Sequence, residues 1–157
     1  MEQVIHTFYK AFSKLDAETM VSCYHQNIKF QDPAFGELNG ERAKNMWRML
    51  CESQKNKDFK IIYSNIISNE FEGSAHWEAF YTFSKTGRKV HNSIHATFQF
   101  QDRKIINHRD KFILQHWAKQ AMGFKGWLLG NTYFFQKKLQ TQTNLMLDKY
   151  IENHSEI

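Results

Sequence analysis

The chain has 157 residues and a net charge of +5, and its length suits one domain with a sizeable core. It contains one proline and seven glycines, so no linker between domains is expected; no apolar run is long enough to span a membrane, and no secretion-signal pattern is present. We therefore expect a cytoplasmic protein without a membrane partner. The basic residues are dispersed through the chain, and no zinc spacing or RNA-binding motif accompanies them, so no nucleic-acid partner is expected.

Three amphipathic helices are predicted in the N-terminal part. The first covers about residues 2–14, the second begins after Asp16, which is a typical N-cap, and the third begins at Gly40-Glu41. The apolar positions that recur every three or four residues are Ile5, Phe8, Phe12, Leu15, Met20, Val21, Tyr24, Ala43, Met46, Trp47 and Leu50.

Strands are predicted where the apolar period is two. "IKFQD" (residues 28–32) is a short strand that ends at Asp32, directly before the only proline. From residue 58 onward a strand around 59–63 is followed by "AHWEAFYTFS", "VHNSIHATFQF" and "IINHRDKFIL", with the tight turns "KTGRK" and "QDRK" between the last three. Consecutive strands joined in this way predict an antiparallel meander packed on the early helices, which is an α+β domain.

The C-terminal part returns to helical spacing. "QHWAKQAM" predicts a helix that stops at Gly123, and a last helix is predicted for about residues 132–153. Between them "FKGWLLGNTYFF" is unusually apolar for a connection. The stretch could touch a membrane surface, but closure of the pocket mouth or packing on a partner subunit is favoured, because an exposed apolar patch of this size is rarely left uncovered. We expect a domain over residues 1–122 and a C-terminal segment over 123–157 that packs on the same domain or on a partner subunit.

Two stretches resemble a known superfamily. "IKFQDPAFGELNG" followed by a helix is similar to the ketosteroid isomerase strand whose aspartate before proline is the general base, and "GRKVHNSIHATFQFQDRKIINHRDKF" is similar to the last hairpin of limonene-epoxide hydrolases. Over about residues 2–122 the chain resembles the nuclear transport factor 2-like superfamily, which includes the SnoaL-like polyketide cyclases. The resemblance implies a cystatin-like cone: a curved antiparallel sheet on three N-terminal helices around an apolar pocket, here with an extra C-terminal helix. It also implies a homodimer through the convex sheet face.

The resemblance transfers only part of each relative's chemistry. Asp32 falls on the isomerase base, but the two oxyanion donors of the isomerases fall on Phe8 and Ala96, so steroid isomerisation of that type is not expected. Asp110 falls on one catalytic aspartate of the epoxide hydrolases, whose arginine falls on Trp77.

The second hydrolase aspartate falls on Ala79, so epoxide hydrolysis is not expected either. The polyketide-cyclase branch fits best. There an aspartate on the last long strand acts as general acid and base in an aldol closure, a role that Asp110 matches, and His95 lies near the position of a contributing histidine.

Side-chain alternation divides the strands into an inner and an outer face. If Asp110 faces the pocket, so do Ile106, His108 and Phe112, and His108 is placed to hydrogen-bond Asp110 and tune its pKa. We therefore predict Asp32, Asp110 and His108 as catalytic residues. The predicted ligand-binding residues are Phe8, Phe30, Trp47, Tyr63, Trp77, Ala96, Phe98 and Phe112.

Each of these residues also has a structural interpretation. Asp32 before proline can brace a turn, Asp110 can pair with Lys111 at the surface, and His108 can satisfy a backbone carbonyl. The opposite strand parity places His91 and His95 on a polar outer face, unless a bulge turns His95 inward.

No cofactor or metal site is predicted. The histidines lack ligand spacing, since residues 91 and 95 on a strand lie about 13 Å apart, and Cys23 and Cys51 imply no disulfide. Two functions remain open. One is a cofactor-free acid/base enzyme, an isomerase, cyclase or aldol-type lyase, acting on an apolar carbonyl compound. The other is a non-catalytic apolar-ligand-binding or dimeric interaction module of the same fold.

Overall fold

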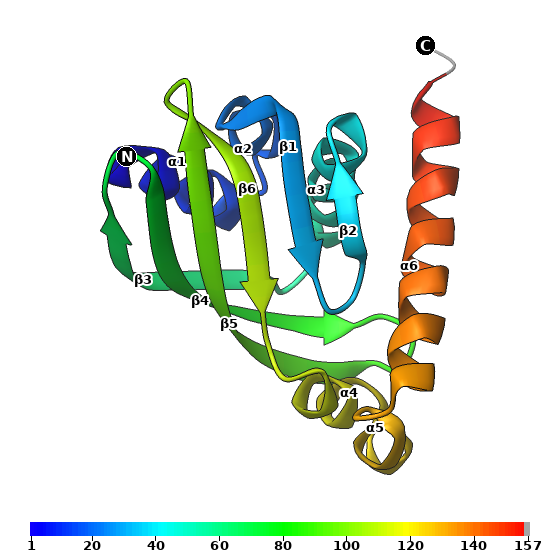
Figure 1. The fold of residues 1–157 in the computed structure, drawn as a ribbon. Helices are drawn as coiled ribbons and strands as arrows, with labels where there is room; N and C mark the ends of the chain where they lie inside the picture. Colours follow the sequence, from blue (N-terminus) through cyan, green and yellow to red (C-terminus); the bar gives the residue numbers. More distant parts are fainter. Residues whose placement is uncertain (156–157) are drawn as a thin grey trace.

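The computed structural model describes residues 1–155 and arranges them as one curved sheet of six strands with helices on its inner face (Figure 1). The strands are β1 (Tyr24–Asp32), β2 (Gly36–Asn39), β3 (Lys60–Ser68), β4 (Glu72–Phe83), β5 (Arg88–Gln101) and β6 (Lys104–Lys111). The helices are α1 (Glu2–Ser13), α2 (Ala17–Ser22), α3 (Glu41–Gln54), α4 (Leu114–Met122), α5 (Phe124–Leu129) and α6 (Tyr133–His154). The predicted α+β class, with three N-terminal helices and a C-terminal helix, is confirmed.

The strand order in the sheet is β2-β1-β6-β5-β4-β3. Strands β3 to β6 form the predicted antiparallel meander, whereas β1 pairs parallel with β6 and antiparallel with β2. β1 begins at Tyr24, earlier than expected, so Tyr24 lies on a strand beside β6 and not on the second helix. The last strand is shorter than expected, because Leu114 already belongs to α4.

The early helices follow the predicted pattern. The carboxylate of Asp16 accepts a hydrogen bond from the backbone N–H of Thr19 at 3.1 Å and so caps α2. Phe8 on α1 and Trp47 on α3 are almost fully buried, and their rings meet edge to face with centroids 5.3 Å apart. The inner side of the sheet is therefore closed by aromatic side chains.

A register shift between Gln99 and Phe100 changes the alternation on β6. Ile105 is fully buried and Ile106 only partly, so the prediction that Ile106 faces inward is wrong, because the bulge adds a residue there. Beyond the bulge, His108 and Asp110 are buried as expected. On β5, His91 and His95 are exposed on the outer face, and no bulge turns His95 inward.

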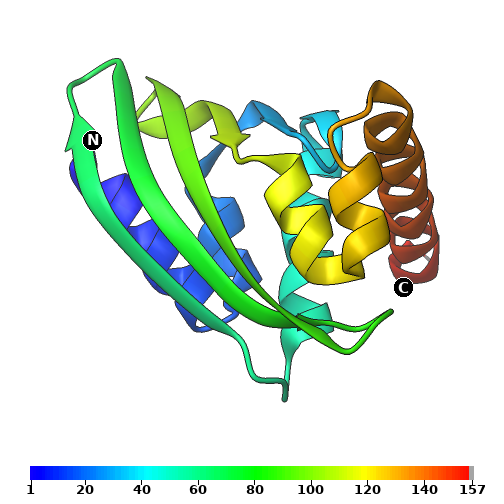
Figure 2. The ribbon, with the colours of Figure 1, turned by 90° about the horizontal axis from the view of Figure 1, so that it is seen from below.

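The C-terminal helices extend the fold beyond the sheet. α6 stands along the edge of the sheet that carries β2, and α4 and α5 lie side by side at one end of the molecule (Figure 2). Part of the apolar stretch expected as a connection thus forms the short helix α5. Within residues 1–155, no helix has both the length and the apolar character needed to span a membrane.

Glycine allows α5 to lie directly on α4. A Cβ atom at Gly126 would lie 2.0 Å from the carbonyl oxygen of Ala118, and one at Gly130 would lie 2.8 Å from the Ala118 side chain. Real Cβ atoms do not approach backbone so closely, so these positions require glycine.

We expect Gly126→Ala to destabilise the protein by roughly 1–3 kcal/mol, because the added methyl group must push α5 away from α4. Urea unfolding measures the change. Gly87→Ala is the control, since its Cβ would meet no atom within 4 Å and its φ of +69° costs only the backbone strain. A Gly126→Ala variant as stable as Gly87→Ala would contradict the direct contact between α5 and α4.

Candidate functional site

A cavity of about 290 Å³ lies between the inner face of the sheet, α3 and α6. Its walls are mainly aromatic and aliphatic, and they include Phe30, Trp47, Trp77 and Phe112. Asp32, at the end of β1, and Asp110, on β6, are the only carboxylates that line it among the described residues. The fold thus brings two acids that are far apart in the sequence to one apolar space.

A chain of buried hydrogen bonds holds Asp110. One carboxylate oxygen, Oδ1, lies 3.0 Å from Nε2 of His108 and 3.2 Å from Nε1 of Trp77. Nδ1 of His108 lies 2.6 Å from the hydroxyl of Tyr24, which accepts a hydrogen bond of 2.8 Å from Nε1 of Trp47. All five side chains are buried.

The acceptor at one end gives the direction of the hydrogen bonds along this chain. The Asp110 carboxylate can only accept, so a neutral His108 donates to it from Nε2. Nδ1 of His108 then accepts from the Tyr24 hydroxyl, whose oxygen accepts from Nε1 of Trp47. Tyr24 on β1 and Trp47 on α3 thus support this tautomer of His108, and Asp110 accepts from both His108 and Trp77.

Asp32 has two environments at once. Its Oδ1 accepts hydrogen bonds from the backbone N–H groups of Ala34 and Phe35, at 2.9 and 2.6 Å, so it braces the turn between β1 and β2. The same side chain lines the cavity. Burial raises the pKa of Asp32 to about 7; the hydrogen bonds from Phe35 and Ala34 oppose the rise, and the charge of Asp110 adds to it.

Helix α6 binds the carbonyl oxygens of this same turn. Gln140 donates to Pro33 at 3.2 Å, Thr143 donates to Ala34 at 2.9 Å and Asn144 donates to Phe35 at 2.9 Å. The turn that presents Asp32 is therefore held from inside by its own carboxylate and from outside by the C-terminal helix.

Tyr81 is a site residue to which the sequence patterns assigned no role. It lines the cavity from β4, and its hydroxyl accepts a hydrogen bond of 2.7 Å from Nε1 of Trp117 on α4. Burial raises the pKa of Tyr81, the hydrogen bond from Trp117 opposes this, and the charge of Asp32 adds to the rise. Since its oxygen is occupied as an acceptor, the Tyr81 hydroxyl has its hydrogen available for an oxygen in the cavity.

The structure separates the predicted ligand-binding residues into two groups. Phe30, Trp47, Trp77 and Phe112 line the cavity. The others pack behind this lining and do not line the cavity: Phe8, Tyr63, Ala96 and Phe98. His108 lies in the same second layer, in contact with Asp110 and stacked against Trp47 with ring centroids 6.0 Å apart.

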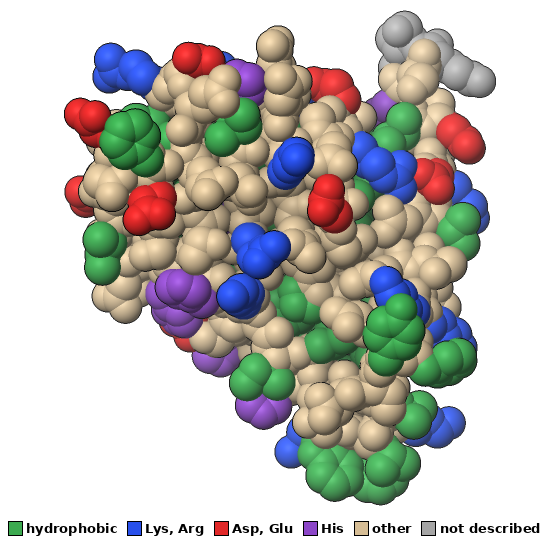
Figure 3. Space-filling view, in the orientation of Figure 1, with side chains coloured by type: hydrophobic (Ala, Val, Ile, Leu, Met, Phe, Trp, Pro, Cys, Tyr) green, Lys and Arg blue, Asp and Glu red, His purple; other side chains and the backbone are tan. Residues whose placement is uncertain are grey.

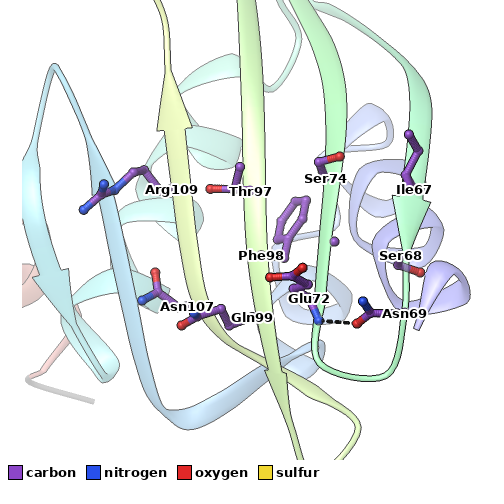
Figure 4. A pocket seen from close by; sticks show the side chains of 11 residues that line it. Ile67, Ser68, Asn69, Glu72, Ser74, Thr97, Phe98, Gln99, Asn107 and Arg109 are labelled. Atoms are coloured by element: carbon purple, nitrogen blue, oxygen red, sulfur yellow. Dashed lines mark hydrogen bonds between the residues drawn. The ribbon is translucent and has the colours of Figure 1, made fainter.

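A second hollow crosses the outer face of the sheet. It has a volume of about 680 Å³ and is lined by side chains of β3 to β6 that include Ser74, Thr97, Gln99 and Arg109 (Figure 4). These groups are mostly polar and solvated, and none brings two carboxylates into an apolar surrounding. We therefore take the inner cavity as the candidate site. Among residues 1–155, no three His, Cys, Asp or Glu side chains are grouped so that they could hold a metal ion.

The comparison with protein families shows to which family the chain belongs. The family model described as "SnoaL-like domain" matches residues 5–108, so the chain belongs to the SnoaL-like family. This confirms the resemblance to the nuclear transport factor 2-like superfamily. No curated protein sequence matches the chain at a significant level.

Solved structures show the same fold at low sequence identity. A putative polyketide cyclase from Xanthomonas campestris pv. campestris is similar with a TM-score of 0.60 and 15% identity, covering 75% of this chain and 93% of the other. An LEH-like epoxide hydrolase from M. tuberculosis has a TM-score of 0.59 and 17% identity, covering 82% and 89%. An NTF2-like protein of unknown function from Cytophaga hutchinsonii has a TM-score of 0.58 and 18% identity, covering 72% and 99%.

We expect Asp32→Asn to change the pH dependence of stability. The asparagine oxygen can still accept the two turn hydrogen bonds, but the proton-binding group is lost. The pKa of Asp32 rises from 3.8 to about 7 on folding, so the folded protein binds more protons between these values and loses stability as the pH rises. The free energy of unfolding of the variant, relative to that of the wild type, should therefore increase steadily from about pH 4 to 7, as measured by urea unfolding.

Asp16→Asn is a matched control with the opposite sign. Hydrogen bonds from Thr19 lower the pKa of Asp16, so that carboxylate stabilises the fold above its unfolded-state pKa and this contribution is lost as the pH falls. The wild type should therefore become more stable relative to the Asp16→Asn variant as the pH rises through about 4. Parallel pH profiles for Asp32→Asn and wild type would refute a raised pKa at Asp32.

We expect Tyr24→Phe to destabilise the protein by about 1–3 kcal/mol, because it leaves Nε1 of Trp47 and Nδ1 of His108 buried without a partner. Tyr9→Phe is the control. The Tyr9 hydroxyl is buried and has no hydrogen-bond partner in the described chain, so its removal should be neutral or stabilising. Equal effects of the two substitutions on urea unfolding would contradict the hydrogen-bond chain.

Proposed function

We propose that this SnoaL-like protein is a cofactor-free acid/base enzyme that moves a proton on an apolar, carbonyl-containing small molecule. Its reaction would be an isomerisation, a cyclisation or an aldol-type step. One observation carries the proposal: Asp32 and Asp110 line the same mostly apolar cavity.

Asp110 is assigned the role of base. His108 and Trp77 both donate to Oδ1, and no hydrogen bond from residues 1–155 reaches Oδ2. Oδ2 is then the oxygen that accepts a proton from the carbon next to the substrate carbonyl. His108 is a positioning residue in this scheme, because it touches Asp110 and does not line the cavity.

Tyr81 is assigned the role of hydrogen-bond donor to the carbonyl oxygen. Removal of the proton turns the carbonyl into an enolate, whose oxygen carries the developing charge. The Tyr81 hydroxyl, oriented by the N–H of Trp117, would stabilise that oxygen. Donors of this kind are worth about 10²–10³ in rate. Tyr81 would thus provide the oxyanion hydrogen bond that Phe8 and Ala96, at the positions of the isomerase donors, cannot provide.

Asp32 is assigned the role of acid. With a pKa of about 7 it holds a proton in part of the molecules at neutral pH, and it can return a proton to the enolate at a second carbon. One proton is taken by Asp110 and one is given by Asp32, so the substrate is rearranged with no net change in its composition. A proton passing from Asp110 to Asp32 through solvent restores the resting enzyme.

The comparisons support this class of chemistry at the level of the family. Among the similar structures are a putative polyketide cyclase and an epoxide hydrolase, both of which are named for reactions on small molecules. We also propose that the protein is cytoplasmic and a homodimer, with the outer sheet face around His91 and His95 as the contact. Residues 1–122 would form the SnoaL-like domain, with 123–157 as its addition.

A non-catalytic pocket for an apolar ligand is the alternative. It is favoured by the hydrogen bonds from Ala34 and Phe35 to Asp32, which give this acid a structural role without any chemistry. The size and apolar walls of the cavity suit either function.

Deuterium exchange distinguishes the two functions. A panel of apolar cyclic ketones is incubated with the protein in deuterated water, and exchange at the carbon next to the carbonyl is followed by NMR. We expect exchange above the buffer rate, lowered about 10²-fold or more in Asp110→Asn and in Tyr81→Phe.

Lys57→Gln serves as a control, because Lys57 also lines the cavity but has no part in the proposed proton transfer. If ketones bind, as shown by shifts of the Trp77 and Trp117 indole signals, but no exchange occurs, the ligand-binding alternative replaces the enzyme. If no ketone binds, both forms of the proposal fail for this substrate class.

A further inference from the structure

Six large apolar side chains project into solvent from α5 and the start of α6. Their exposed fractions run from 44% at Trp127 to 76% at Phe134. The set, called the apolar patch below, consists of Phe124, Trp127, Leu128, Leu129, Tyr133 and Phe134. None of these six side chains lines the inner cavity, so the apolar patch does not take part in closing the pocket.

The exposure follows from how α5 packs. α5 approaches α4 through Gly126 and, directly after its last residue, through Gly130, and neither position has room for a Cβ atom against Ala118. A short amphipathic helix normally buries its large apolar residues, but here small residues are buried and large ones face outward. The close contact therefore presents the apolar patch.

The chain segment that carries the patch has charged residues of one sign only. No aspartate or glutamate occurs between Asp110 and Asp148, a stretch that contains α4, α5 and most of α6. Lys125, Lys137 and Lys138 are exposed within or beside the patch, and Nζ of Lys137 lies 5.4 Å from the centre of the Tyr133 ring. Figure 3 shows green apolar side chains at the lower end of the molecule with blue basic ones beside them and no red acidic ones among them.

This charge pattern decides between possible partners. A second copy of the chain docking through the same patch would bring the lysines of both copies together without an acid to pair with them. A membrane surface with anionic lipids offers negative charge at the level of the headgroups and an apolar layer beneath it. Aromatic side chains and lysines are the residues that favour this boundary.

We propose that the apolar patch attaches the protein to the surface of an anionic lipid bilayer, with its aromatic and leucine side chains inserted and its lysines at the headgroups. This differs from the expectation of no membrane partner, which favoured closure of the pocket mouth or packing on a partner subunit over contact of this stretch with a membrane surface. Attachment needs no such segment, because α5 lies on the surface.

Attachment would also place the cavity close to the lipid. α6 contributes Tyr133 and Phe134 to the patch and, from its following turns, Leu139, Thr143 and Met146 to the cavity wall. Apolar compounds concentrate in membranes, so a protein held there meets them at high local concentration. The inference does not rest on the proposed chemistry, and vesicle binding is measured without any substrate.

The test is co-sedimentation of the full chain with vesicles of phosphatidylcholine alone and of an equal mixture with phosphatidylglycerol. We expect binding to the anionic vesicles that weakens as salt is raised, and little binding to the neutral ones. The charge-reversed variant K125E/K137E/K138E should bind the anionic vesicles at least about a hundredfold more weakly, at roughly fivefold or more for each lysine. The variant W127S/F134S should not bind.

Matched controls exclude general effects. K14E/K29E/K55E changes the net charge equally at exposed positions away from the patch, and I67S/F71S removes two apolar side chains that are 71% and 74% exposed in the β3–β4 hairpin. Both controls should bind nearly as the wild type does.

Three results would overturn the proposal. The first is no sedimentation with anionic vesicles. The second is an equal loss of binding in the control and patch variants. The third is a dimer in solution that W127S/F134S dissociates, without vesicle binding, which would assign the patch to a second copy of the chain.

Discussion

The buried carboxylate of Asp110 determines how the side chains on the inner face of the sheet are arranged. A carboxylate removed from water and surrounded by aromatic side chains is costly unless hydrogen bonds to it replace those of water. Its direct partners are Trp77 on β4 and His108 on β6. His108 is in turn bonded to Tyr24 on β1, and Tyr24 to Trp47 on α3. The chain of bonds thereby ties α3, β1, β4 and β6 to one oxygen atom. A substitution at any link leaves a buried donor or acceptor without a partner, so stability and the orientation of the acid depend on the same residues.

The second acid is positioned by a different device. Asp32 braces its own turn, and the carbonyl groups of that turn are in turn bound by side chains of α6. The C-terminal helix, which lies beyond the stretch matched by the family model, therefore contributes to a position within it. α6 is in this sense part of the site, although only some of its residues line the cavity.

Local patterns in the sequence were sufficient for most of the fold and for part of the site. Helical and strand periods located α1, α3, α6 and the meander, and alternation placed Asp110 and His108 inward, but the same rule failed at Ile106, where a bulge interrupts it. Tyr24 was assigned to a helix because its spacing from Met20 is also helical, so its bond to His108 was not foreseen. No hydrogen-bonding role was predicted for Tyr81, because its partner Trp117 lies on α4, a helix whose position relative to the sheet the sequence does not indicate. Contacts between residues far apart in the chain were thus the part that local patterns could not supply.

The parallel pairing of β1 with β6 has a consequence for how the chain folds. Tyr24 and His108 are 84 positions apart, and everything between them, including α3 and the β3–β5 hairpins, must be made before the two can meet. Contacts of such large sequence separation close long loops and slow folding, whereas the hairpins assemble from neighbours. On a ribosome β1 emerges first and must wait for β6, with β2 as its only partner in the sheet meanwhile. The centre of the molecule is therefore assembled last, and a chain interrupted before β6 would expose the edge of β1 together with the aromatic surface beneath it.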